Sequence, residues 1–123
     1  NCFIDAEGGD KITVFDWEFC VRGRGTYDVA TFLCEALTPQ QRSNQEIELL
    51  NVYHSTLLEN NIGDYSFTDC FTDYRLSMLE IFVFWIIVGA QCNFDSIRER
   101  RYLINSVNRL DAAIRDLKCS EFI

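Results

Sequence analysis

The stretch that decides the fold is ITVFDWEFCVRGRGTYDVATFL, residues 12–33. It opens as a short β-rich run ending at the acid Asp16, and it continues through a loop that contains two glycines. The apolar run over residues 27–37 then favours a helix, with a second acid, Asp28, near its start. Packing alone explains poorly why two carboxylates mark the junctions of strand, loop and helix.

The residues before this stretch predict a β-hairpin. The segments NCFID and KITVFDW are β-rich and are separated by AEGGD, whose Gly-Gly pair suits a tight or bulged turn. Because the strands of a hairpin are antiparallel, we expect Asn1 to lie at the same end of it as Asp16. The expected apolar inner face of the hairpin consists of Ile4, Ile12 and Val14 together with the aromatic residues of these segments.

The residues after this stretch predict three more helices. Thr38, followed by a proline, is typical of a helix start, and a stripe of 3.6-residue period continues over residues 39–60. Ser66 is the expected N-cap of the next helix, with Asp69 in the place of the usual capping-box glutamate. The last expected helix begins at about Asp95 and is amphipathic.

One of these helices is apolar on every side. Residues 76–90, LSMLEIFVFWIIVGA, are fewer than the roughly 20 that a bilayer span requires, and they include Glu80. A helix without a polar face belongs in a protein interior, so we expect residues 76–90 to form a central buried helix. The predicted fold is therefore mostly α with a small N-terminal β-hairpin (α+β).

Composition and charge limit the possible partners. The chain has 123 residues, 48% of them hydrophobic, which is enough for one packed domain. The net charge of -8 argues against a nucleic-acid surface, and no membrane partner is expected. We interpret the basic cluster Arg98, Arg100 and Arg101 as a solvated helix face. We expect a cytoplasmic protein and leave its oligomeric state open.

The six cysteines are interpreted as buried, reduced thiols. None forms a C-x-x-C pair, and most lie in apolar runs. A zinc site is not expected, because cysteine ligands usually come in close pairs and the only histidine is His54, expected on a helix and partly exposed. A secreted domain held by disulfides is an alternative. The cysteines are Cys2, Cys20, Cys34, Cys70, Cys92 and Cys119.

Asp16 is a candidate metal ligand. A carboxylate at the end of a rigid strand is held in place, and Mg²⁺ binds one or two carboxylates together with phosphate oxygens and water. The side-chain carbonyl of Asn1 is the expected second ligand, while a turn-forming aspartate is the alternative interpretation of Asp16. Glu18 could orient a second metal or brace the loop. Arg22 and Arg24 could meet phosphate, but a solvated loop is the preferred interpretation.

Several motifs together resemble one family. NCFID followed by ITVFDWE resembles the stretch after the catalytic loop of aminoglycoside-phosphotransferase-like kinases, where D-W-E or D-W-Q replaces D-F-G. GRGTYDVATFL resembles the YDLA element of that branch. LLNVYHSTL and YSFTDCFTDYRLSML are similar to the ecdysteroid-kinase-like (choline kinase-like) subgroup. The resemblance covers essentially the whole chain and implies that residues 1–123 form the C-terminal lobe of a protein-kinase-like small-molecule kinase.

The resemblance also implies roles for individual residues. Asn1 and Asp16 would bind the Mg²⁺ ions that bridge the phosphates of ATP, whose γ-phosphoryl passes to a small-molecule hydroxyl. Asp28 would be a buried acid that begins a helix and accepts hydrogen bonds from the catalytic-loop backbone; a carboxylate favoured by the helix dipole is the alternative. An apolar or sterol-like acceptor wall, or ordinary core packing, would account for Phe67, Phe71, Tyr74, Phe82, Phe84 and Trp85.

The chain departs from the complete family pattern. These residues contain neither the H-x-D motif with its base nor the nucleotide-binding lobe with its Lys–Glu pair. We therefore do not expect this segment alone to turn over substrate, and the acceptor stays open. The alternative function is a non-catalytic helical binding or scaffold module, a degenerate phosphotransferase, which explains the helices equally well but gives the two acids no role.

Overall fold

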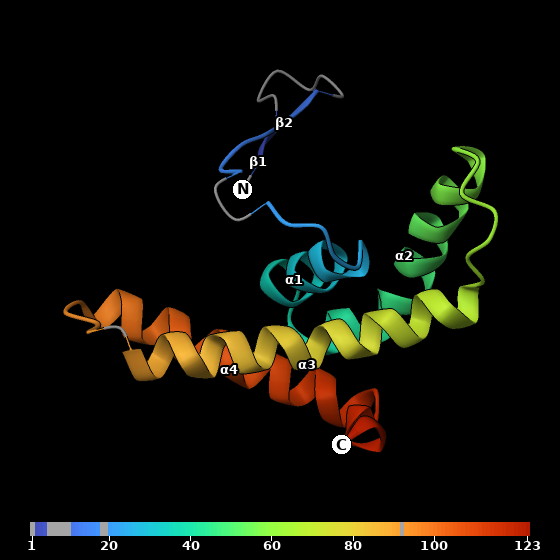
Figure 1. Ribbon diagram of the computed structural model, residues 1–123. Helices are drawn as coiled ribbons and strands as arrows, with labels where there is room; N and C mark the ends of the chain where they lie inside the picture. Colours follow the sequence, from blue (N-terminus) through green and yellow to red (C-terminus); the bar gives the residue numbers. More distant parts are fainter. Residues whose placement is uncertain (1, 5–10, 18–19, 92) are drawn as a thin grey trace.

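The computed structural model describes residues 2–4, 11–17, 20–91 and 93–123. A two-stranded hairpin is followed by α-helices and a short 3-10 helix, which confirms the predicted mostly α fold with a small N-terminal hairpin (Figure 1). The elements are β1 (Cys2–Ile4), β2 (Ile12–Val14), α1 (Thr26–Ala36), α2 (Pro39–Glu59), α3 (Phe67–Gln91), α4 (Ile97–Asp116) and η1 (Cys119–Phe122).

The predicted helix starts are confirmed by their caps. The hydroxyl of Thr38 accepts a hydrogen bond from the Gln41 backbone N–H at 3.3 Å, and the Gln41 side chain accepts one from the Thr38 N–H at 3.0 Å. Ser66 accepts one from the Asp69 N–H at 3.1 Å. A second capping box, at Ser96, begins α4. Each cap is worth about 1 kcal/mol, because it satisfies backbone donors that a helix start leaves unpaired.

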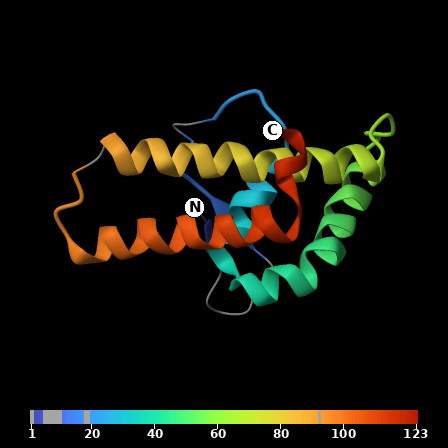
Figure 2. The ribbon, with the colours of Figure 1, turned by 90° about the horizontal axis from the view of Figure 1, so that it is seen from below.

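The helices pack around the crossing of α1, the first half of α3 and the second half of α4. α3 and α4 lie side by side and run in opposite directions, and α2 turns away from them along another side of the core (Figure 2). The 3-10 helix η1 packs back against α3 and α4. The buried apolar core consists of Ala30, Leu33, Cys34, Leu50, Cys70, Tyr74, Met78, Ile81, Leu110, Ala113, Leu117 and Cys119.

The prediction that residues 76–90 form a fully buried helix is wrong for its outer half. Burial of α3 ends at Ile81; beyond it, each of four apolar side chains is about half exposed: Val83, Phe84, Ile86 and Ile87. There α4 lies beside α3, with Trp85 packing edge-to-face on Tyr102 at 5.4 Å between ring centroids. Figure 1 shows α1 over the middle of α3 and α2 toward its N-terminal end. No described helix is long and apolar enough to cross a membrane.

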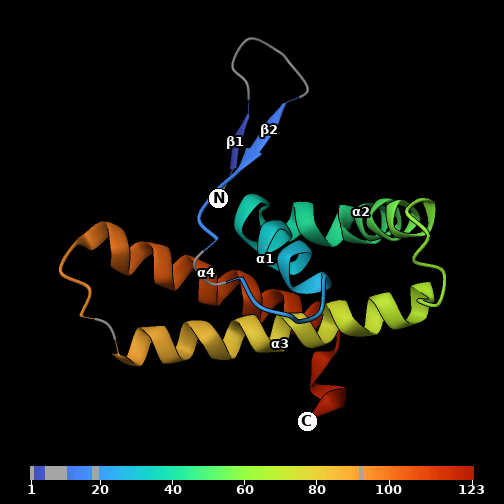
Figure 3. The same ribbon diagram turned by 45° about the horizontal axis from the view of Figure 1, so that its top comes forward.

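The hairpin does not pack as the sequence predicted. β1 and β2 are antiparallel, with Cys2 opposite Val14, and they project away from the helices (Figure 3). Ile12 is 65% exposed and Val14 is 52% exposed, so the expected apolar inner face is wrong for these two residues. The side chain of Ile4 lies outside the described part. A two-stranded hairpin gains a buried face only where it has a partner, and among the described elements the strands contact each other but no helix.

Candidate functional site

Asp16 lies where the hairpin ends and the chain turns. It follows β2 by two residues, its side chain is exposed, and its φ is 68°. The other non-glycine residues with positive φ in the described ranges are Asn61 and Lys118, both just beyond a helix end, where left-handed residues commonly cap helices. Asp16 instead follows a strand. Asp and Asn adopt this conformation more readily than other L-residues do, so the local backbone favours an aspartate here.

Asn1, the predicted partner of Asp16, lies outside the described residues, and so does Glu18. Because Cys2 pairs with Val14, β1 begins at the end of the hairpin where β2 finishes. Within the described ranges, no group of three or more His, Cys, Asp or Glu side chains is placed to hold a metal ion. Of the two predicted metal ligands, Asn1 and Asp16, the described residues therefore include Asp16.

The loop between Asp16 and α1 is fastened to α3 by Arg24. The Arg24 Nε lies 3.0 Å from an oxygen of Asp73, and its Nη1 forms an ion pair with Glu80. Arg22 and Arg24 are both exposed, as a solvated loop predicts, but Arg24 in addition forms two ion pairs with α3 that were not predicted. The sequence did not indicate these contacts, because Asp73 and Glu80 lie 49 and 56 residues after Arg24 in the chain.

Two further contacts hold the start of α1. A Cβ at Gly25 would lie 2.3 Å from the Tyr53 hydroxyl, so a side chain there would require the Tyr53 ring to move. The Thr26 and Ser77 hydroxyls are buried and lie 3.1 Å apart. Ser77 donates to the carbonyl of Asp73 at 2.8 Å, so its oxygen accepts the hydrogen bond from Thr26. The segment that leads into α1 is thus held by α2 and α3 together.

Asp28 is exposed, and the prediction that it is a buried acid is wrong. It is the third residue of α1, whose buried face contains Thr26, Ala30, Leu33 and Cys34. No described side chain forms a hydrogen bond or ion pair with its carboxylate. Asp28 is at the rim of an open groove of about 400 Å³ between α1 and α2, whose other lining residues are Val29, Phe32, Leu33, Leu49, Val52 and Tyr53.

His54 is a satisfied, half-buried histidine, as predicted. Its Nε2 lies 2.8 Å from the carbonyl oxygen of Tyr65. A carbonyl only accepts, so Nε2 carries the proton in this contact. The ring also packs edge-on against Phe67, with 5.6 Å between centroids. These contacts give His54 a structural role between α2 and the segment that leads into α3.

The described cysteines are free thiols, three of them buried. Cys34, Cys70 and Cys119 lie in the core, whereas Cys20 is exposed in the loop. Burial raises the pKa of the Cys34 thiol to about 12, so it stays protonated at neutral pH. The prediction of buried reduced thiols is confirmed for the three core cysteines and wrong for Cys20. The side chains of Cys2 and Cys92 lie outside the described part.

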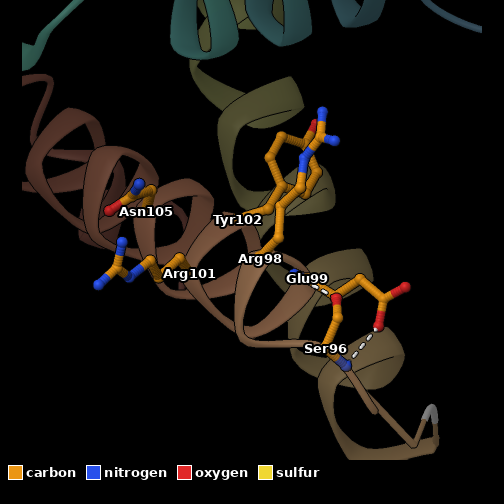
Figure 4. Close-up of a pocket in the computed structure, with 6 residues that line it drawn as sticks. All are labelled: Ser96, Arg98, Glu99, Arg101, Tyr102 and Asn105. Carbon is orange, nitrogen blue, oxygen red and sulfur yellow. Dashed lines mark hydrogen bonds between the residues drawn. The ribbon is translucent and has the colours of Figure 1, made fainter.

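A second hollow lies at the start of α4 (Figure 4). Two backbone N–H groups there are engaged by the helix's own cap: that of Ser96 donates to the Glu99 side chain, and that of Glu99 donates to the Ser96 hydroxyl. Arg98 and Arg101 project from the helix in different directions, as Figure 4 shows, and both are exposed. All three arginines of the predicted basic cluster, Arg98, Arg100 and Arg101, are exposed, as the solvated interpretation requires, and Arg100 also donates a hydrogen bond to the carbonyl of Phe94 at 2.8 Å. The lining residues are Ser96, Arg98, Glu99, Arg101, Tyr102 and Asn105.

Comparison of the chain with protein-family models, with curated proteins and with solved structures finds no match. The case for a function therefore depends on the residues themselves. The most specific of them is Asp16, an exposed acid on a left-handed turn at the end of a strand.

Proposed function

We propose that this chain is the C-terminal lobe of a small-molecule kinase that transfers the γ-phosphoryl of ATP to a hydroxyl group with the help of Mg²⁺. The observation that carries the proposal is the placement of Asp16, an exposed acid with a positive φ that lies two residues after β2. A residue held in a rarely populated backbone conformation outside a helix end is a reason to suspect a functional constraint.

The chemistry of Asp16 fits a magnesium ion. Mg²⁺ prefers oxygen ligands and is commonly bound by one or two carboxylates plus substrate phosphates, so a single described carboxylate suits a nucleotide-bound ion better than an all-protein cage. Asn1 would supply the second oxygen. When bound, the ion neutralises charge on the phosphates. Asp16 would orient the ion, and with it the nucleotide, at the end of the hairpin.

Asp28 would brace the catalytic loop. Its carboxylate is exposed at the start of α1 and has no described side-chain partner, so its oxygens are able to accept backbone N–H bonds from a loop preceding residue 1. The N-terminal end of a helix favours a negative charge, which suits a carboxylate at this position. Asp28 would thus hold the loop in shape without touching the substrate.

The reaction that we propose divides its tasks between this chain and residues before it. An Asp of an H-x-D motif would accept the proton of the attacking hydroxyl, with four residues between that Asp and Asn1. The free thiols of the described cysteines are consistent with the reducing, ATP-containing cytoplasm, where we propose that the protein acts.

A binding or scaffold module is the second candidate. It is favoured by the half-exposed apolar side chains on the outer half of α3, because contiguous exposed apolar surface often marks a contact with another molecule. The gene sequence immediately before Asn1 discriminates the two candidates. An H-x-D motif at the stated spacing supports the kinase, and its absence supports the scaffold.

Phosphoryl transfer by the full-length protein tests the proposal directly. The assay supplies Mg·ATP with a panel of alcohols that includes sterols, and it measures phosphorylated acceptor by mass spectrometry. We expect Asp16→Asn to lower kcat by at least about 100-fold, because charge stabilisation at the phosphates is lost while asparagine keeps the left-handed turn.

The matched control is Asp64→Asn, an exposed acid in the loop before α3. We expect it to retain wild-type activity, and both variants should keep the wild-type melting temperature. Undiminished turnover by Asp16→Asn would refute the metal-binding role.

A further inference from the structure

We propose that Arg24 is a positioning residue for Asp16, and that its ion pairs with α3 hold the loop that carries Asp16 in the geometry needed for metal and nucleotide binding. This inference rests on the proposed kinase function. It goes beyond that function by assigning a role to a residue in neither the metal site nor the groove beside Asp28.

Arg24 contacts α3 through two different nitrogens of its guanidinium. The Arg24 Nε donates a hydrogen bond to Asp73 at 3.0 Å, and the Arg24 Nη1 donates one to Glu80. Asp73 and Glu80 are seven residues apart, about two helical turns, and therefore lie on the same face of α3. A planar guanidinium offers several donors in a fixed arrangement and can serve both carboxylates at once, whereas a lysine offers one compact charge.

Asp73, one of the two acceptors on α3, is held in place by a second hydrogen bond. The second oxygen of Asp73 accepts a hydrogen bond from the Tyr65 hydroxyl at 2.9 Å. Burial, together with this hydrogen bond, raises the pKa of Tyr65, so the hydroxyl keeps the proton that it donates. The backbone of Tyr65 is in turn held by His54. Arg24 thus docks onto a carboxylate whose orientation is already set by α2 and the segment before α3.

The loop between Asp16 and α1 is attached to the helices at its α1 end, whereas its other end continues into the projecting hairpin. Directly after Arg24, the buried hydrogen bond between Thr26 and Ser77 joins the chain to α3, and Gly25 lies next to the Tyr53 hydroxyl. In the other direction the strands contact no described helix. The loop therefore connects Asp16 to the helices, and it is anchored at its α1 end.

We call the two ion pairs of Arg24 with Asp73 and Glu80 the Arg24 clamp. We expect the clamp to contribute little to the free energy of unfolding. The Arg24 side chain is 40% exposed, and solvent-exposed ion pairs are typically worth 1 kcal/mol or less. Geometry is a stricter requirement, since misplacing a reacting group by about 1 Å can cost about 100-fold in rate. An effect on catalysis without a matching loss of stability is therefore the signature of a positioning role.

The test compares Arg24→Gln, Arg24→Lys and the matched control Arg115→Gln in the full-length protein. Arg115 also forms an ion pair on the surface, with Asp111, but within α4. Two independent readouts are needed. Hydrogen–deuterium exchange of peptides covering residues 11–17 and 20–25 reports on the loop, and kcat and the KM for Mg·ATP report on the site. Thermal melting monitors the fold.

We expect Arg24→Gln to speed exchange in both peptides and to lower kcat/KM for Mg·ATP by about tenfold, with a melting temperature close to that of the wild type. Arg24→Lys should recover only part of the loss, because it keeps the charge without the planar fork. Arg115→Gln should change neither readout.

Each contrary result has its own meaning. Unchanged exchange in Arg24→Gln would overturn the clamp, whatever the activity. Faster exchange with unchanged kcat/KM would overturn the positioning role. A wild-type protein that binds no Mg·ATP would refute the proposed kinase function, and the positioning role with it, while the exchange data would still report whether Arg24 holds the loop.

Discussion

The guanidinium of Arg42 is 1% exposed and forms an ion pair with Glu46, one turn further along α2, at 2.5 Å. Its other branch lies 2.5 Å from Asp116 of α4, and the Tyr74 hydroxyl of α3 donates to Glu46 at 3.1 Å. A buried network of charged and polar side chains thus joins three helices at the edge of the core.

Removing Arg42 should destabilise the protein strongly. Arg42→Met leaves Glu46 buried without its cation, and breaking one side of a buried ion pair typically costs about 3–5 kcal/mol. We expect the free energy of unfolding, measured by urea titration, to fall by that amount. Arg42→Met combined with Glu46→Gln should recover part of the loss, since a neutral amide oxygen still accepts from Tyr74. If the free energy of unfolding of the Arg42→Met single variant stayed within about 1 kcal/mol of the wild-type value, the result would contradict a buried network.

The two halves of α3 should respond differently to the loss of an apolar side chain. Met78 is fully buried, so Met78→Ala should cost about 2–5 kcal/mol through lost transfer energy and the cavity left behind. Ile87 is 48% exposed, so Ile87→Ala should cost less than about half as much. Chemical denaturation of both variants measures the difference. Equal costs would show that the outer half of α3 is covered in solution.

Stability should fall at alkaline pH, partly because of Cys34. Its pKa rises from an ordinary value of 9.0 to about 12 through burial. Above pH 9 the unfolded chain therefore releases a proton that the folded chain retains, and the free energy of unfolding decreases as the pH rises from 9 towards 12. Below pH 9 the thiol is protonated in both states and contributes no slope.

Urea titrations between pH 7 and pH 10.5 check this expectation, with Cys34→Ala as the comparison. The variant lacks the thiol, so its stability should decline less steeply above pH 9. Parallel curves for the two proteins would show that the Cys34 thiol ionises as readily in the folded state as in the unfolded chain. Burial also raises the pKa of Tyr74, which acts in the same direction and is present in both proteins.

The helix starts could be predicted from the sequence because capping is local. The side chain of Thr38 reaches a backbone N–H three residues away, and Ser66 does the same. The position of Asp16 was equally readable, since the end of a β-rich run followed by a glycine-containing loop is a local pattern. These are the cases in which the interacting groups lie within one turn of each other.

What the sequence did not reveal depends on distant partners. Arg24 and Arg42 contact acids in other helices, up to 74 residues away, and no local pattern indicates which acid will be near. Apolar periodicity likewise cannot show where a helix loses its neighbours, so residues 76–90 were predicted to be buried along their whole length. The predicted burial of Asp28 is wrong for the same reason, because burial at this position depends on what covers α1.

The central claim is that the carboxylate of Asp16 binds the metal ion of a nucleotide complex. Paramagnetic broadening tests it most directly: Mn²⁺ with ATP is titrated into the isotope-labelled full-length protein, and the backbone amide signals near the hairpin end are followed by NMR. We expect the signals of residues 14–17 to broaden in the wild type and to stay sharp in Asp16→Asn at the same Mn²⁺ concentration. Equal broadening in both proteins, or none in the wild type, would contradict the account.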